Sequence, residues 1–254
     1  MKSRVLMNAM LAIALVGCNG ESTKVEDAHP KHGKAHANHW DYGTENGPTH
    51  WEEFSKTCGK GIHQSPVNII PGETISMDHS YDLSMHEDVT SMNNIIDNGH
   101  SIKATPHESG SIELHGETFN LLQFHFHGKS EHTVDGKRYD MVAHLVHQNP
   151  KTKQLAVVAV FFEEGVPHQI LDDVVNNVGA SIKINPQDLL PEDVASYYHY
   201  VGSLTTPPCS ENVQWYLLKT PKTASKQQIE HFREFYVDNE RPVQELHDRR
   251  VEVN

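Results

Sequence analysis

The chain reads Leu121-Leu-Gln-Phe-His-Phe-His127 near its middle, a stretch in which apolar and polar residues alternate from Leu122 onward. Side chains of a β-strand point alternately to the two faces of a sheet. The alternation therefore predicts a strand with one face that carries Gln123, His125 and His127. Two imidazoles on one face, separated by one pleat, are candidate ligands of a metal ion.

A second alternating stretch, Met141 to His147, could pair alongside and complete the site. Its alternation puts Val142, His144 and Val146 on one face, so His144 is the predicted third ligand. Three neutral imidazoles leave the fourth tetrahedral position of a zinc ion open to water, which is the catalytic arrangement. The alternative, that these histidines decorate a solvent-facing sheet, stays open because a chain with 20 histidines contains such spacings by chance.

The rest of the chain is predicted to be mostly strands and turns, because Gly, Pro, Asn and Asp punctuate short apolar runs. The continuous apolar run from Leu155 to Phe162 predicts a central strand that is covered on both faces. Helices are expected over Gln169 to Val178 and, after a capping box of Ser225 and Gln228, over Ile229 to Tyr236. The expected fold class is mostly β, with short peripheral helices.

Composition excludes two broad classes of protein. The formal net charge of -13 over 254 residues argues against a protein that binds nucleic acid by neutralising phosphates. With 37% apolar and 22% charged residues, the chain is too polar for a protein with many membrane spans. It is apolar enough for one packed domain, and no nucleic-acid partner is expected.

The first residues have the pattern of a secretory signal. Lys2 and Arg4 precede a short apolar run that ends in Leu15-Val-Gly-Cys18. This ending resembles a bacterial lipobox, so we expect residues 1–17 to be a signal peptide and Cys18 to carry a lipid. An ordinary signal peptide followed by an incidental cysteine is the alternative.

Residues 18–37 are polar and contain no Phe, Trp or Tyr, which predicts a flexible tether. Its histidines could bind metal loosely, although a solvated linker is the simpler interpretation. The folded domain is then expected over residues 38–254. These features predict an exported protein, periplasmic or in the cell envelope, that contacts a membrane through a lipid anchor only.

Lipidation of Cys18 would leave Cys58 and Cys209 as an even pair in an oxidising compartment. We therefore predict a disulfide bond between Cys58 and Cys209. Two free thiols are the alternative.

Eight blocks of sequence follow one another in a specific order. They are His39-Trp-Asp-Tyr-Gly43, Gln64-Ser-Pro-Val-Asn-Ile69, Asn98-Gly-His100, Gln123-Phe-His-Phe-His127, Ser130-Glu-His132, His144-Leu-Val-His147, Gly202-Ser-Leu-Thr-Thr-Pro-Pro208 and Asn239-Glu-Arg-Pro-Val-Gln244. Through these blocks the chain resembles the α-class carbonic anhydrases from about Asn38 to Val253. The resemblance implies a large twisted, mostly antiparallel sheet with short surface helices, one zinc ion per chain, and the disulfide already expected.

The resemblance also implies which residues carry the chemistry. His125, His127 and His144 match the zinc ligands. Thr205 matches the hydroxyl that accepts a hydrogen bond from the zinc-bound hydroxide and donates one to a carboxylate, here Glu131. The implied reaction is the reversible hydration of carbon dioxide to bicarbonate and a proton.

The substrate and the released proton need further residues. An apolar wall suits carbon dioxide, which has no charge and weak acceptors. The positions that match this wall are Val146, Val157, Leu204 and Trp215, with Thr206 beside it. His100 matches the proton-shuttle histidine, which must titrate near neutrality, and Tyr42 matches a tyrosine that orders the connecting water. The alternative for His100 is a turn residue after Asn98-Gly99.

One position departs from the family. Metal-bound histidines normally donate their second N–H to an outer acceptor. Gln123 can serve His125, and Asn239 is a further expected outer residue. The partner of His144 should be residue 142, where the family usually has glutamate and this chain has Val142. We hypothesise that zinc is held less tightly here, because losing such a partner costs about 10–100-fold in affinity or activity.

The sequence thus predicts a zinc-dependent carbonic anhydrase with carbon dioxide and bicarbonate as its small-molecule partners. The alternative is a non-catalytic zinc-binding or surface interaction protein of the same fold. The resemblance is compatible with a homodimer, which no feature of the sequence tests.

Overall fold

The computed structural model describes residues 39–77 and 83–254. The predicted signal peptide, the lipidation site Cys18 and the tether over residues 18–37 lie outside the described residues. In the described ranges, no helix has the length and apolar character needed to cross a membrane.

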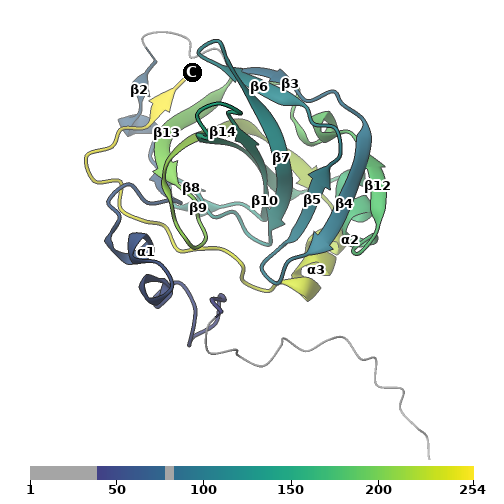
Figure 1. Cartoon of the computed structure of the whole chain (residues 1–254), viewed down its shortest axis with the longest axis horizontal. Coiled ribbons are helices and arrows are strands. Elements are labelled where there is room, and N and C mark those ends of the chain that lie inside the picture. The colour runs from purple at the N-terminus through teal and green to yellow at the C-terminus, as the bar shows by residue number, and fades with distance from the viewer. Residues whose placement is uncertain (1–38, 78–82) are drawn as a thin grey trace, which may run out of the picture. The chain divides into compact units, whose positions relative to one another are not determined.

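One large, strongly curved sheet dominates the described residues (Figure 1). Its strands are, in spatial order, β12 (Ser181–Ile184), β4 (Ser91–Asp97), β5 (Ile102–Pro106), β7 (Glu117–His127), β10 (Met141–Gln148), β11 (Leu155–Glu164), β14 (Glu211–Ala224), β13 (Tyr197–Ser203), β15 (Glu252–Val253) and β2 (Ile75–Ser76). Two further strands, β3 (Ser84–His86) and β6 (Ser111–Leu114), pair with each other, and β6 also pairs with β7. Parallel pairing joins β11 to β14 and β15 to β2, while β7, β10 and β11 pair antiparallel. The predicted mostly β fold is confirmed.

The remaining elements are short and peripheral (Figure 1). A small sheet consists of β1 (Asn68–Ile69), β8 (Thr133–Val134) and β9 (Lys137–Arg138). The α-helices in the described ranges are α1 (Lys56–Lys60), α2 (Gln169–Val175) and α3 (Lys226–Phe235). Three 3-10 helices there are η1 (Trp51–Glu53), η2 (Pro71–Glu73) and η3 (Pro186–Leu189).

The strand β11 explains why its sequence is apolar throughout. It lies between β10 and β14, and its side chains alternate between two apolar clusters on the two faces of the sheet. Val158 and Val160 belong to one cluster, and Val157 and Ala159 belong to the other. Both faces are covered, which confirms the prediction of a central strand over Leu155 to Phe162.

The helix α2 begins at Gln169 as predicted but ends early, whereas α3 begins at Lys226, three residues before the predicted start at Ile229. In α3, Ser225 Oγ accepts from the backbone N–H of Gln228 and Gln228 Oε1 accepts from that of Ser225, which confirms the capping box. The helix α2 ends at Val175 instead of Val178. The chain must leave the helix there because Gly179, with a φ of 87°, donates its N–H to the backbone of β4.

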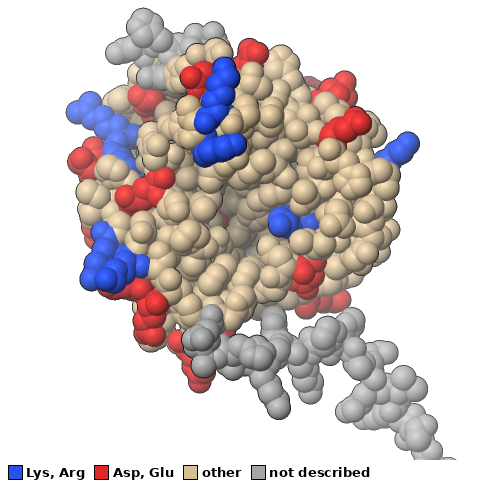
Figure 2. Space-filling model, viewed as in Figure 1, with Lys and Arg blue, Asp and Glu red and all other residues tan. Residues whose placement is uncertain are grey.

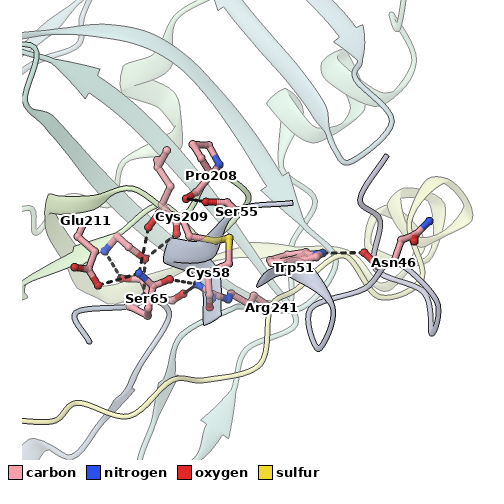
Figure 3. The surroundings of a disulfide bond; sticks show 12 residues. Asn46, Trp51, Ser55, Cys58, Ser65, Pro208, Cys209, Glu211 and Arg241 are labelled. Atoms are coloured by element: carbon pink, nitrogen blue, oxygen red, sulfur yellow. Dashed lines mark hydrogen bonds between the residues drawn. A yellow bond between two sulfur atoms is a disulfide. The ribbon is translucent and has the colours of Figure 1, made fainter. Parts of the chain in front are cut away.

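The predicted disulfide between Cys58 and Cys209 is present, with an S–S distance of 2.07 Å (Figure 3). The buried guanidinium of Arg241 lies beside it and donates hydrogen bonds to Gln64 Oε1, to the Ser65 carbonyl and to the Cys58 carbonyl. Gln64 in turn donates to the carbonyl of Cys209. These bonds fix the segment from Cys58 to Ser65 to two segments of the second half of the chain, those around Cys209 and Arg241.

Candidate metal centre

Three histidines converge on one face of the large sheet. His125 and His127 lie at the end of β7, and His144 lies in β10, where the antiparallel register pairs it with His125. One nitrogen from each ring lies within 4.8 Å of the others. The pairing of two strands therefore brings together the three predicted metal ligands.

Burial favours the neutral form of two imidazoles of this cluster, His125 and His144. Loss of solvation lowers the pKa of both His125 and His144 well below the usual value, and the neighbouring His127 lowers it further. A neutral imidazole is the form that binds a metal ion, because a protonated ring has no lone pair to offer. His125 and His144 can thus bind a cation without first releasing a proton.

Outer partners orient the two rings of β7. His125 Nδ1 lies 2.9 Å from Gln123 Oε1, and His127 Nδ1 lies 2.6 Å from the backbone oxygen of Asn239. In both contacts the acceptor is an amide or peptide oxygen, so Nδ1 carries the hydrogen and Nε2 keeps its lone pair. His127 Nε2 is buried and has no hydrogen-bond partner within residues 39–77 and 83–254. An inward, unpartnered lone pair is what a metal ligand requires.

His144 is oriented differently. Its Nδ1 lies 3.8 Å from Glu131 Oε2, while its Nε2 is buried and has no partner in the described part of the chain. Val142, two residues earlier on the same strand face, is fully buried and offers no acceptor. The donor set of three neutral nitrogens nevertheless fits a zinc ion with one position left for water.

Glu131 lies against the metal cluster and is fully buried. Its Oε1 accepts from the backbone N–H of Arg241 at 2.9 Å, and its Oε2 lies 3.5 Å from His127 Nε2. Oε2 accepts no hydrogen bond from any residue that the structure describes. Because Arg241 also contacts the disulfide region, the position of this carboxylate depends on the part of the chain drawn in Figure 3.

Thr205 is buried in the loop that follows β13. This loop is held at both ends by backbone hydrogen bonds, from Leu204 to Ser210 and from Cys209 to Thr206. The disulfide at Cys209 attaches the same loop to α1. The threonine is therefore carried by a short, well-fixed segment.

The predicted apolar wall lies beside the histidines. Val146, Val157 and Trp215 are buried in one cluster, and Leu204 packs against it. The ring of Trp215 lies 5.0 Å from that of His144, and its Nε1 donates to the Ser203 carbonyl. The side of the molecule seen in Figure 2 has a hollow near its middle, bordered mainly by uncharged residues.

The predicted shuttle residue His100 stacks on an aromatic ring. Its imidazole lies 3.4 Å from the ring of Trp40, at an angle of 9°, and 4.7 Å from the ring of His39. Burial, followed by the charge of His39, lowers the pKa of His100 to about 4. In this stacked position the ring therefore titrates below the neutral range that a shuttle needs, a difference from the expectation.

The hydroxyl of Tyr42 is buried and has no hydrogen-bond partner in the described ranges. Its ring packs edge-on against those of Trp40 and Trp51. Burial raises the pKa of Tyr42 well above the usual value, and the nearby Glu131 raises it further. The hydroxyl therefore stays protonated and able to donate.

Sequence reasoning missed two contact sets around the site. One set is the stack of His39 and Trp40 on His100. The first motif block contains His39 and Trp40, but nothing in the sequence indicates that they contact His100. A buried chain of hydrogen bonds runs from Ser65 through Tyr200 to His132. No periodicity could have found it, because these residues lie on segments far apart in the sequence.

Three imidazoles with ring nitrogens within 4.8 Å of one another are a donor set of the class found in catalytic zinc sites, here on a curved, mostly antiparallel sheet. Residues 46–254 match the family model described as eukaryotic-type carbonic anhydrase. The chain belongs to the α-carbonic anhydrase family. Members of this family are lyases that hydrate carbon dioxide, and the chain is an enzyme of this kind.

The similarity to individual relatives extends over most of the chain. A carbonic anhydrase of Klebsiella pneumoniae is 41% identical over 230 residues, which cover 85% of this chain and 91% of the relative. One from Nostoc is 35% identical over 252 residues, covering 94% and 95%. The α-carbonic anhydrase of Thermovibrio ammonificans, solved in complex with the inhibitor sulfanilamide, is 39% identical with a TM-score of 0.79, covering 85% of this chain and 99% of that structure.

Proposed function

We propose that the chain binds one zinc ion through His125, His127 and His144 and with it hydrates carbon dioxide reversibly to bicarbonate and a proton. The observation that carries this proposal is the convergence of three ring nitrogens within 4.8 Å on adjacent strands. Zinc, when bound, acts as a Lewis acid that lowers the pKa of water to about 7 in carbonic anhydrases, so that a nucleophile exists at neutral pH.

Thr205 and Glu131 orient that nucleophile in our proposal. The buried Oε2 of Glu131 has an unused acceptor position beside the metal cluster. The hydroxyl of Thr205 donates to it, which turns the oxygen lone pair of Thr205 toward the catalytic water. The hydrogen of that water then points away from the substrate, and its lone pair points toward it.

Carbon dioxide binds against the apolar wall. Val146, Val157, Leu204 and Trp215 present hydrocarbon and ring surface next to the histidines, with Thr206 beside them. Such a surface binds a neutral, non-polar molecule and has little attraction for the charged product. Bicarbonate is therefore released more readily than it would be from a polar wall.

The proton leaves through His100. In the stacked position its pKa is about 4, so the ring accepts a proton at neutral pH only after it turns away from Trp40 toward solvent. Tyr42, held protonated by burial, donates to the water between the metal centre and His100. The shuttle thus requires a rotation of the imidazole in each cycle.

The proposed cellular location follows the expectations from the sequence. We propose that the folded domain over residues 38–254 is exported to the periplasm or cell envelope and is anchored through a lipid on Cys18. The Cys58–Cys209 disulfide supports this location, because such bonds persist in oxidising compartments. Radiolabelled palmitate incorporated into the wild type but not into Cys18→Ser would test the anchor.

Metal analysis combined with a rate measurement tests the function. We expect about one zinc ion per chain, rapid carbon dioxide hydration in stopped-flow experiments, loss of that activity in the apoprotein, and recovery when zinc is returned. Sulfanilamide, the inhibitor of the Thermovibrio relative, should inhibit the zinc-loaded protein.

The rival function gives a different result in the same experiment. A non-catalytic zinc-binding protein would take up zinc without accelerating hydration, and sulfanilamide would have no activity to inhibit. A zinc-loaded chain that leaves the hydration rate at background would overturn the proposed reaction.

A further inference from the structure

Besides His127 Nε2, which belongs to the predicted ligand set, two further buried histidine nitrogens near the metal centre have no hydrogen-bond partner among the described residues. They are Nε2 of His144 and Nδ1 of His132. Both side chains are buried, and their rings lie 6.4 Å apart in an edge-to-face arrangement. The ring of Trp215 contacts both, at 5.0 Å from His144 and 4.6 Å from His132. The two unpartnered nitrogens therefore lie on neighbouring rings, one of a predicted metal ligand (His144) and one of a residue that is not a predicted ligand (His132).

The neighbouring hydrogen bonds show which nitrogen of His132 carries hydrogen. Ser65 Oγ accepts from the Ser203 N–H at 3.0 Å and lies 2.7 Å from the Tyr200 hydroxyl, which lies 2.6 Å from His132 Nε2. Because the Tyr200 oxygen is the one acceptor that the described residues offer to the Ser65 hydroxyl, we assign the Ser65 hydrogen to it. The Tyr200 hydrogen then goes to His132 Nε2, which leaves the ring hydrogen on Nδ1.

His144 is in the same condition. Its Nδ1 lies 3.8 Å from Glu131 Oε2, beside the cluster of the three histidines. When this nitrogen binds the metal ion, the ring hydrogen is on the other nitrogen, Nε2. Two buried N–H donors thus have no acceptor. A buried donor without an acceptor loses its bond to water and gains nothing in return.

Val142 belongs to the apolar cluster of Trp215, the ring that contacts both His144 and His132. It lies two residues before His144 on the same face of β10, about 6.6 Å along the strand, and pairs with His127 of β7. It is fully buried in the apolar cluster that contains Val146 and Trp215. By contrast, Gln123 stands two residues before His125 on β7 and supplies its oxygen at 2.9 Å.

We propose that Val142 sets the metal affinity of this centre, because it leaves the outer N–H groups of both His144 and His132 without an acceptor. A carboxylate or amide oxygen at position 142 would accept from both and would hold the His144 ring in its ligating orientation. Removing such an outer partner typically changes metal affinity by about 10–100-fold. This inference rests on the zinc site of the proposed function.

Zinc release, measured without any activity assay, tests the inference. Zinc-loaded wild type, Val142→Gln and Val142→Glu would be mixed with a chromogenic chelator, with Val142→Leu as the apolar control of larger size. We expect release about 10–100-fold slower from the Gln and Glu variants than from wild type, and unchanged release from the Leu variant. Equal release from wild type, Gln and Glu variants would overturn the proposal.

A polar side chain at a buried position can prevent folding, so a smaller change is included. Val142→Thr has almost the shape of valine and adds one oxygen, and thermal unfolding of each apoprotein would confirm that it folds. If the larger variants do not fold, slower zinc release from Val142→Thr than from wild type supports the proposal. Equal release from the folded Thr variant overturns it.

The role of His132 is tested in a second background. In His132→Leu, the outer donor of His132 is gone while His144 is intact. We expect Val142→Gln to slow zinc release in both backgrounds, but to raise the unfolding midpoint of the apoprotein more when His132 is present. An equal rise in both backgrounds would contradict a shared acceptor. None of these readouts needs carbon dioxide hydration, so a failure of the proposed reaction is recognised separately.

Discussion

The strands β7 and β10 both bring histidines to the predicted metal centre, but only the histidines of β7 have acceptors for their outer nitrogens. His125 and His127 each have an oxygen acceptor within 2.9 Å of the outer nitrogen. His144 has a valine at the corresponding place and an outer nitrogen without a partner in the described residues. The comparison shows that the choice of ligands and their support are separate properties of a metal site.

The support on β7 also comes from two different sources. Gln123 is local, two residues from the ligand on the same strand, and is a side chain that mutation can remove. Asn239 acts through its backbone oxygen, and its side chain holds Gly128 and the carbonyl of His100. The β7 side is thus supported by both sequence-local and tertiary hydrogen bonds, whereas the outer nitrogen of His144 on β10 has no acceptor among the described residues.

The largest effect is expected when a ligand itself is removed from the weaker side. His144→Ala should abolish stoichiometric zinc binding and lower carbon dioxide hydration by several orders of magnitude, because two imidazoles do not hold the ion in a catalytic geometry. Metal content and stopped-flow rates would be measured together. His86→Ala, which changes an exposed histidine of β3, is the control and should retain both zinc and activity.

Removing the Gln123 side chain should leave His125 on β7, like His144 on β10, without an acceptor for its outer nitrogen. Gln123→Val is expected to accelerate zinc release by about 10–100-fold, because His125 loses the acceptor that fixes its ring. Release to a chelator would be compared with that from Leu122→Val, a change on the exposed opposite face of the same strand. Unchanged release from Gln123→Val would mean that outer partners do not matter on either strand.

Breaking the disulfide should separate stability from metal retention. Cys58→Ser with Cys209→Ser is expected to lower the free energy of unfolding by about 2–5 kcal/mol, because the unfolded chain gains freedom. Zinc release should stay as in wild type, since the ligands and their partners lie on the strands, while hydration slows because the Thr205 loop loosens. Denaturant unfolding and chelator release would be measured on the same samples. Faster zinc release from the double variant than from wild type would show that the difference in support between the β7 and β10 histidines depends on contacts outside the two strands.

The smallest effect on the metal centre is expected from changes in the stack of His39, Trp40 and His100, which lies outside β7 and β10. His39→Ala should raise the pKa of His100 from about 4 toward 6.5, but not all the way, because burial against Trp40 remains. NMR titration of the His100 ring would measure this. Zinc release should not change, and a His100 pKa that stays at about 4 would show that His39 has no influence.

The same shift has a consequence for stability. The folded-state pKa of His100 lies below its ordinary value, so the unfolded chain binds more protons between pH 6.5 and about 4. The contribution of His100 to stability is therefore complete above pH 6.5 and is lost as the pH falls through this range. His39→Ala should reduce the loss, which unfolding curves at several pH values would detect.

Local patterns predicted most of the fold and the core of the site. The period of two over Leu121 to His127 placed His125, His127 and Gln123 on one face, and the unbroken apolar run placed β11 in the centre of the sheet. The helix α2 ended before Val178 because the backbone of Gly179 pairs with β4, a contact that helical periodicity does not contain. A local pattern predicts which way side chains face, but it does not contain the distant residues whose contacts end a helix or strand.

The contacts that complete the site belong to tertiary structure. The stacking of His100 on Trp40 joins residues about 60 positions apart, and the lowered pKa of His100 follows from it. The chain of bonds from Ser65 through Tyr200 to His132 spans three distant segments. The sequence already predicted that Val142 deprives His144 of its acceptor, but the loss at His132 was visible only in the folded chain.

The amino-acid sequence by itself predicted the three metal ligands, the alternation that puts them on one face, the disulfide between an even pair of cysteines and the missing acceptor at Val142. Those properties are local, because strand geometry converts residue spacing directly into side-chain direction. Tertiary structure decided which atoms meet across the sheet, how far burial lowers the pKa of His100, and which donors remain unpaired. Such properties depend on distances between segments that are far apart in the chain, and only the packed fold sets those distances.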